Sequence, residues 1–106
     1  MKINITKSHG TQNSFIIVYD NKNHALIKNN IKKICSQFKT DGFLLISDHQ
    51  DYDFRMDYFN NDGTWETMCA NGARCAGLFM HTFHNYNSTL TFLAGDGKHK
   101  IKINDS

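Results

Sequence analysis

The chain has 106 residues, enough for one domain with a hydrophobic core and too few for two, so we expect a single domain over residues 1–106. Twelve Lys and Arg residues against ten Asp and Glu residues leave a formal net charge of +2, and the basic residues are too scattered for a nucleic-acid-binding surface. No apolar run is long enough for a membrane span and no hydrophobic signal sequence opens the chain, which predicts a cytoplasmic protein that binds neither nucleic acid nor membrane.

The first sixty residues alternate between strand and helix patterns. Stretches rich in β-branched and aromatic residues predict strands over residues 2–6, 14–20, 43–48 and 52–60. A polar loop, residues 7–13, joins the first two of these strands. Between the second and third, apolar residues at spacings of three and four predict one amphipathic helix over residues 24–38, with Leu26, Ile27, Ile31, Ile34, Cys35 and Phe38 on its apolar side.

The second half of the chain predicts a buried helix and a hairpin. "NNDG" at 60–63 is a strong turn signal. From residue 71 to about 84 the side chains are small or apolar around most of the circumference, which predicts a helix buried on nearly all sides. Residues 88–105 read as a hairpin that turns at "GDG". The order ββαββαββ predicts an α+β fold, with a mixed or antiparallel sheet curved around a central buried helix.

Cys69 precedes this buried helix and is a candidate acid/base residue. The unpaired N–H groups of Ala70, Asn71 and Gly72 would point toward whatever lies beside the helix start. The positive end of the helix dipole favours both a thiolate and a bound carboxylate. Both effects assist one reaction, the removal of a proton from the α-carbon of an amino acid, because a neutralised carboxylate makes that carbon more acidic.

Structural roles for the cysteines and histidines are alternatives to this chemistry. Buried free cysteine is a common core residue, and this reading stays open for Cys69; for Cys35 and Cys75 it is the expected one. Cys69 and Cys75 have the wrong spacing for a shared zinc ion, so no metal site is predicted. His81 and His84 have a spacing that can hold a metal, but their place near a helix end favours solvated or C-capping histidines.

The segment "FNNDGTWETMCANGARCAGLF" (59–79) resembles the signature of the diaminopimelate epimerases, in which an "FNADG" turn leads to a catalytic cysteine in "CGNGARC". "KSHGTQNSFIIVYD" (7–20) resembles the opening "KMHGLGNDFVVID" of that family. "TLTFLAGDGKHKIKI" (89–103) resembles the hairpin that closes the first half of these enzymes. The resemblance therefore extends over the whole chain and implies one half of the diaminopimelate epimerase-like fold.

This resemblance implies a cofactor-independent epimerase that converts LL- to meso-diaminopimelate for lysine and peptidoglycan precursor synthesis. In such an enzyme one cysteine removes the α-proton and a second cysteine returns a proton on the opposite face, without PLP or metal. Carried over by position, Cys69 is one of these cysteines. The residues that would contact the amino-acid substrate are Asn13, Asn60, Ala70, Asn71 and Gly72. For Asn13 and Asn60 the alternative is a purely structural role in turns.

The chain departs from the family pattern in three ways. Ala70 stands where the family has glycine, and Gln12 and Ser14 replace a glycine and a carboxylate. The family's enzymes are much longer and have two similar halves, and the second cysteine lies in the half that is missing here. Three explanations are open: half of a split or truncated enzyme, a non-catalytic remnant, or a half that pairs with a second copy so that Cys69 faces Cys69. The alternative function is a non-catalytic half-domain that binds a small carboxylate or a partner chain.

Overall fold

The computed structural model describes residues 3–10 and 12–103. The strands are β1 (Thr6–His9), β2 (Ser14–Tyr19), β3 (Gly42–Ser47), β4 (Phe54–Asn60), β5 (Trp65–Glu66), β6 (Thr89–Ala94) and β7 (Gly97–Lys102). The helices are α1 (His24–Lys28), α2 (Ile31–Phe38) and α3 (Ala70–His84). No helix in the described part of the chain has the length and hydropathy to cross a bilayer.

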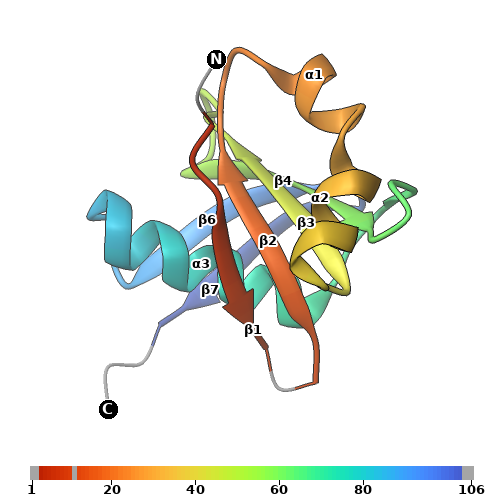
Figure 1. Cartoon of the computed structure of the whole chain (residues 1–106). Coiled ribbons are helices and arrows are strands. Elements are labelled where there is room, and N and C mark those ends of the chain that lie inside the picture. Colours follow the sequence, from red (N-terminus) through yellow and green to blue (C-terminus); the bar gives the residue numbers. More distant parts are fainter. Residues whose placement is uncertain (1–2, 11, 104–106) are drawn as a thin grey trace.

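All seven strands belong to one mixed sheet, which confirms the predicted α+β class. The strand order is β1-β2-β3-β4-β6-β7. Strand β5 pairs with the last part of β4, on the same edge of β4 as β6 and beyond the end of β6. The β2–β3 and β4–β6 pairs are parallel, because α1–α2 and α3 respectively carry the chain back between them, and the other pairs are antiparallel. Figure 1 shows α3 on one side of the sheet and α1 and α2 on the other.

Alternation along the central strands divides the core into two layers. The layer that packs on α3 receives Phe15, Ile17, Leu44, Ile46, Phe54 and Met56. The layer under α1 and α2 receives Ile16, Val18, Phe43, Leu45 and Phe59. Because helices cover both faces, β2 and β3 are almost continuously apolar rather than alternating with polar residues.

The single helix expected over residues 24–38 is two helices. Asn30 causes the break: its side-chain Nδ2 donates to the carbonyl of Leu26 at 2.7 Å, so the side chain takes the acceptor that its own backbone N–H would use in a continuous helix. The backbone N–H of Asn30 bonds to Ile27 instead. Ile27 and Ile31 still face the sheet on either side of the break, whereas Leu26 and Phe38 are exposed.

The first strand lies later in the sequence than expected. β1 pairs with β2 from Thr6↔Ile17 to His9↔Ser14, so residues predicted as loop form most of the strand. The backbone N–H of Gly10 donates to the carbonyl of Asn13 at 2.7 Å and closes the shorter connection. Residue 2 of the predicted strand lies outside the described residues. The two-residue strand β5 was not predicted, because it is defined by its pairing with the end of β4 and has no sequence pattern of its own.

Helix α3 is central, as predicted, but it is not buried on nearly all sides. Gly72, Ala73, Cys75, Ala76, Gly77 and Met80 form its buried face. The side chain of Phe83, in the last turn, is 65% exposed, and on the side opposite the buried face that of Leu78 is 52% exposed. The sheet ends at β1 and β7, and α3 packs on β2, β3, β4 and β7, so these strands leave that side of the helix uncovered.

Candidate functional site

The sequence-predicted site residues gather at one end of the sheet. The starts of β2 and β3 and the end of β4 lie at that end of the sheet, because β2 and β3 are parallel and β4 is antiparallel to β3. The loop before β2 and the start of α3 meet there around the ring of Phe15. A Cβ at Gly10, Gly42 or Gly72 would lie 3.2–3.6 Å from that ring. At Gly42 it would also come within 2.8 Å of the Tyr58 ring, so this close approach requires a glycine. Three separate segments are thus brought against one aromatic side chain.

Cys69 is the N-cap residue of α3. Its backbone is extended, with φ −143° and ψ 116°, and its Sγ accepts a hydrogen bond from the backbone N–H of Gly72 at 3.4 Å. The Cys69 carbonyl accepts from the N–H of Ala73 at 2.8 Å, which starts the helical hydrogen-bond ladder. The side chain is half-buried, whereas Cys35 and Cys75 are buried in the core as expected. Among the three thiols, Cys69 is therefore the one that combines access with a helix start.

The residues after Cys69 contribute in different ways. The N–H groups of Ala70 and Asn71 belong to the first helical turn, where no helical carbonyl can accept from them. Ala70 is exposed. The Asn71 side chain reaches across to the β1–β2 loop, and its Nδ2 donates to Asn13 Oδ1 at 3.0 Å. The N–H of Gly72 is already used by the Cys69 sulfur, so two amides of this turn remain for an anionic ligand.

Asn60 ends β4 and is held through both ends of its side-chain amide. Its Oδ1 accepts from the Tyr58 hydroxyl at 3.2 Å, and its Nδ2 donates to Glu66 Oε1 at 3.0 Å. Burial raises the pKa of Tyr58, and the negative charges of a Cys69 thiolate and of Glu66 add to this effect. The phenol therefore keeps its proton at neutral pH.

Tyr58 and Glu66 received no role from the sequence patterns. A signal existed for Tyr58: it precedes Asn60 by two residues, and residues i and i+2 of a strand lie on the same face. No comparable signal exists for Glu66, because its approach to Asn60 depends on the pairing of the unpredicted strand β5 with β4.

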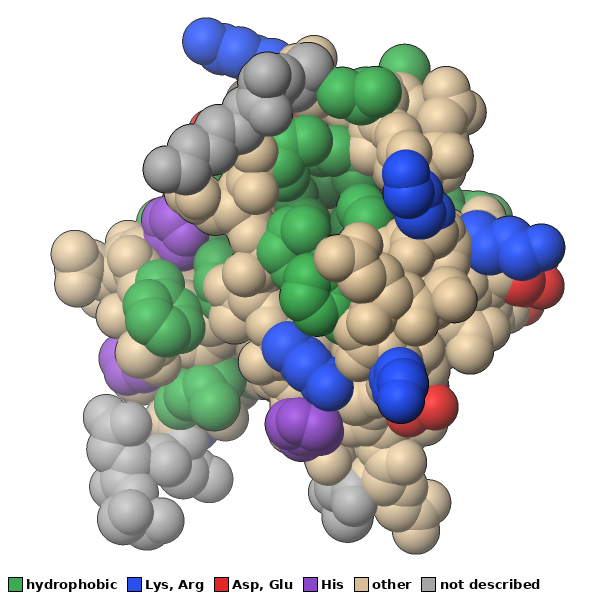
Figure 2. Space-filling view, in the orientation of Figure 1, with side chains coloured by type: hydrophobic (Ala, Val, Ile, Leu, Met, Phe, Trp, Pro, Cys, Tyr) green, Lys and Arg blue, Asp and Glu red, His purple; other side chains and the backbone are tan. Residues whose placement is uncertain are grey.

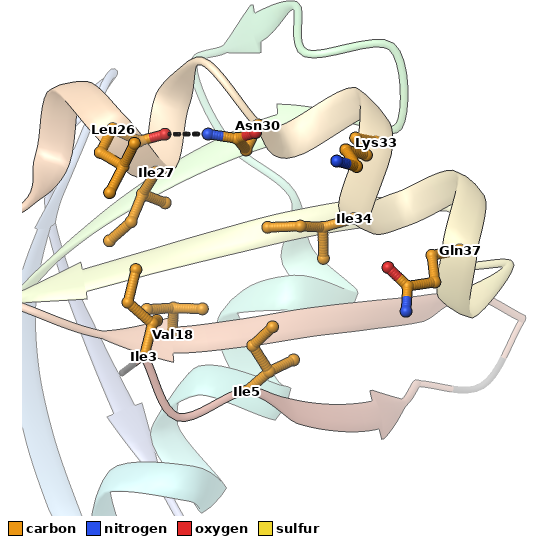
Figure 3. Close-up of a pocket in the computed structure, with 9 residues that line it drawn as sticks. All are labelled: Ile3, Ile5, Val18, Leu26, Ile27, Asn30, Lys33, Ile34 and Gln37. Carbon is orange, nitrogen blue, oxygen red and sulfur yellow. Dashed lines mark hydrogen bonds between the residues drawn. The ribbon is translucent and has the colours of Figure 1, made fainter. Parts of the chain in front are cut away.

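A separate apolar hollow lies on the other face of the sheet and is not part of this site. Figure 2 shows hydrophobic side chains gathered around it, and its volume is about 270 Å³. Figure 3 shows its lining, which comes from Ile3, Ile5, Val18, Leu26, Ile27, Asn30, Lys33, Ile34 and Gln37. None of these side chains is a predicted site residue, and Lys33 is the one ionisable group among them.

The histidines of α3 have contacts other than a metal. His81 Nδ1 lies 2.7 Å from the carbonyl oxygen of Tyr86, just beyond the helix end. The His84 ring packs edge-on against Tyr19, with 4.6 Å between ring centroids. Within residues 3–10 and 12–103, no three His, Cys, Asp or Glu side chains form a group that could hold a metal ion.

Comparison with known proteins places this chain in a sequence family. The sequence profile described as "Diaminopimelate epimerase" matches residues 5–106. A diaminopimelate epimerase of Flavobacterium psychrophilum is 38% identical over 106 residues, which cover 94% of this chain and 41% of the relative. That of Campylobacter jejuni (strain 81116) is 40% identical over 76 residues, 69% of this chain and 30% of the relative. The chain thus spans well under half the length of these relatives.

Solved structures share the fold at low sequence identity. A phenazine biosynthesis protein of the PhzF family from Enterococcus faecalis has a TM-score of 0.72 at 9% identity, covering 88% of this chain and 35% of the other. The PhzF-family protein of Bacillus anthracis has a TM-score of 0.69 at 18% identity, covering 98% and 35%. These similarities support the fold alone. From the profile match and the sequence relatives, this chain belongs to the diaminopimelate epimerase family.

Proposed function

We propose that this chain supplies one of the two acid/base cysteines of a cofactor-independent diaminopimelate epimerase, with Cys69 acting on the α-proton. The observation that carries the proposal is the position of Cys69: an accessible thiol at the N-cap of α3, with its sulfur held by the Gly72 amide. The family relationship and the two remaining amides of the first turn support the same chemistry.

The proposed step is a proton transfer from carbon to sulfur. The Cys69 thiolate takes the proton from the α-carbon, and the electron pair of the broken C–H bond moves onto the substrate carboxylate. The N–H groups of Ala70 and Asn71 would donate to that carboxylate as its charge grows, assisted by the positive end of the helix dipole. Asn13 and Asn60 would hold the polar groups of the substrate beside the sulfur.

Inversion needs a second acid on the other face of the α-carbon, and this chain does not supply one. Cys35 and Cys75 are 1% and 6% exposed, and both side chains belong to the hydrophobic core. Return of the proton from Cys69 regenerates the original isomer. We therefore propose that the second acid comes from the part of the longer relatives that this chain does not span.

The test is hydrogen exchange at the α-carbon. The chain is incubated with LL-diaminopimelate in deuterated water, and mass spectrometry with chiral chromatography follows deuterium and configuration. We expect deuterium at the α-carbon of the LL isomer, with formation of the meso isomer at least about tenfold slower. Saturable binding without exchange would contradict the catalytic proposal and favour the alternative, a half-domain that binds a small carboxylate.

The uncovered side of α3 supports the need for a further partner. Leu78 is exposed on the side of α3 away from the core and Phe83 is exposed in its last turn, and exposed apolar patches mark interaction surfaces. Ser8, Cys75 and Leu78 also line two neighbouring hollows between β1 and α3. We propose that the C-terminal part of the longer protein packs on this side, because the chain matches only 30–41% of its relatives.

This partner proposal is tested by complementation. The chain is mixed with the C-terminal half of the Flavobacterium psychrophilum relative, and formation of meso-diaminopimelate is measured. We expect inversion to increase on mixing, and Phe83→Lys to weaken this increase at least about tenfold by placing a charge in the interface. Phe38→Lys, at the end of α2 on the other side of the sheet (Figure 1), is the matched control and should have no effect. A stable homodimer that buries Phe83 would instead identify a second copy as the partner.

A further inference from the structure

Arg74, Asn71 and Asn13 form a chain of side-chain hydrogen bonds that ends in the proposed site. The Arg74 guanidinium donates from Nη1 to Asn71 Oδ1 at 3.4 Å, three residues earlier on α3. Asn71 Nδ2 donates in turn to Asn13 Oδ1 at 3.0 Å, in the loop before β2. Arg74 is exposed, whereas Asn71 and Asn13 are half-buried. The chain therefore runs from the helix surface to a residue that the proposed function places beside the substrate.

The backbone of the β1–β2 loop lies directly against the Asn71 side chain. A Cβ at Gly10 would lie 3.2 Å from the Cβ of Asn71 and 3.7 Å from its Cγ. The Gly10 N–H is bonded to the Asn13 carbonyl at 2.7 Å, which holds the loop in this position. Contact with the loop thus places the Asn71 amide, but the two ends of an amide have nearly the same shape. Hydrogen-bond partners must decide which end is oxygen and which is nitrogen.

Arg74 decides the orientation of both amides. A guanidinium group only donates hydrogen bonds, so the end of the Asn71 amide that faces it must be the oxygen. The opposite orientation would put N–H groups against a cation, which is unfavourable even at the 3.4 Å separation seen here. The Asn71 nitrogen then faces Asn13, and the end of the Asn13 amide that meets it must be the oxygen. The NH2 group of Asn13 remains, and in the described part of the chain no residue accepts a hydrogen bond from it.

We propose that Arg74 is a positioning residue, which acts through Asn71 so that Asn13 presents N–H donors, and not a carbonyl oxygen, to the ligand. Asn13 then suits an acceptor oxygen, such as one of a substrate carboxylate, and does not suit an ammonium group. An exposed arginine on the helix surface thereby sets which polar group of an amino acid lies beside Asn13. That the ligand is the epimerase substrate rests on the proposed function, whereas the order of the hydrogen bonds does not.

The experiment records the side-chain amide protons of Asn13 and Asn71 by nitrogen-15 NMR in the unmodified chain and in Arg74→Glu. A hydrogen-bonded amide proton exchanges more slowly with water than a free one. In the unmodified chain we expect a slowly exchanging proton on Asn71 and none on Asn13. Because a carboxylate only accepts, both amides should turn over in Arg74→Glu. The Asn13 proton that then faces Asn71 should exchange at least about tenfold more slowly than in the unmodified chain.

Arg74→Lys is the matched variant, because an ammonium group also only donates, and it should keep the pattern of the unmodified chain. Thr82→Glu adds a negative charge to the exposed surface of α3 about two turns from Arg74 and should change neither amide. Equal patterns in Arg74→Glu and the unmodified chain would overturn the inference, as would equal patterns in Arg74→Glu and Arg74→Lys. A slowly exchanging proton on Asn13 in the unmodified chain would also overturn it, whether or not the variants fold.

The consequence for substrate binding is measured by deuterium exchange into LL-diaminopimelate. We expect Arg74→Glu to raise KM about tenfold, because the Asn13 oxygen then meets the substrate carboxylate, and to leave kcat within about twofold. Salt at about 0.5 M screens the added charge, and Arg74→Lys should keep the KM of the unmodified chain. An unchanged KM in an Arg74→Glu chain whose amides have turned over would overturn the assignment of Asn13 to an acceptor oxygen.

Failure of this inference can be told from failure of the proposed function. The NMR experiment contains no substrate, so its result does not depend on which molecule the protein acts on. Absence of deuterium exchange in the unmodified chain contradicts the proposed function. An unaltered amide pattern in Arg74→Glu contradicts the role of Arg74, even where exchange is observed.

Discussion

Cys69→Ala is expected to abolish the exchange of the substrate α-hydrogen, with a loss of about 10²-fold to 10⁴-fold in rate. This range is the usual contribution of a positioned general base. The variant should remain folded, because Cys69 is half-buried and its loss removes one capping interaction, worth about 1 kcal/mol. The measurement is deuterium incorporation into LL-diaminopimelate, with circular dichroism to verify that the variant is folded.

Cys75→Ala is the matched control for this prediction. Cys75 lies on the same helix, but its side chain is buried in the core. Its replacement should lower the free energy of unfolding modestly and leave the exchange rate of the folded protein within about twofold. Equal exchange in Cys69→Ala and the unmodified chain would show that another group removes the proton. It would leave Cys69 with a structural role, the alternative that the sequence kept open.

The core of the fold is predictable because its strands obey a simple alternation. In β2 and β3 each successive side chain enters the opposite layer, and β-branched and aromatic residues fill both layers. The errors lie where tertiary contacts decide. β1 is defined by its register with β2, which residues 2–6 do not reveal. The break at Asn30 depends on one side-chain hydrogen bond that the apolar spacing of the helix conceals.

The helix start at Cys69 was predictable, and the network around it was only partly so. A turn signal followed by a run of small and apolar residues predicted the helix within one residue of its first position, Ala70. The pairing of Asn13 with Asn71 joins residues 58 positions apart, and no local pattern encodes it. Use of the Gly72 amide by the Cys69 sulfur likewise follows from the N-cap conformation rather than from composition.

The sequence pattern of α3 predicts more burial than the structure shows. Apolar residues around most of its circumference predicted burial on nearly all sides, and the structure buries one side. A solvent-facing helix surface ordinarily carries polar residues, whereas Leu78 and Phe83 are exposed. We propose one cause for these uncovered apolar side chains and for the lack of a second acid, namely the part of the relatives that this chain does not span.

Phe15→Ala is expected to have the largest effect on stability. The Phe15 side chain is 1% exposed and packs between the segments that carry Gly10, Gly42 and Gly72. Removal of a buried phenylalanine ring costs about 3–5 kcal/mol, a large part of the total of about 5–15 kcal/mol for a typical domain. Urea denaturation measures the difference. Phe38→Ala, whose side chain is 38% exposed, should cost less and serves as the control.

Phe15→Leu separates the effect on the site from the effect on the fold. Leucine fills much of the same volume, so the loss of stability should be smaller than that of Phe15→Ala. The aromatic edge against Tyr58 is nevertheless gone, and the phenol is no longer fixed from that side. Tyr58 donates to Asn60, a proposed substrate contact, so we expect slower exchange of the substrate α-hydrogen in a variant that is still folded. If Phe15→Leu keeps the unmodified exchange rate, Gly42 and the β3 backbone alone fix Tyr58. If Phe15→Ala costs no more than Phe38→Ala, the ring does not anchor this end of the sheet.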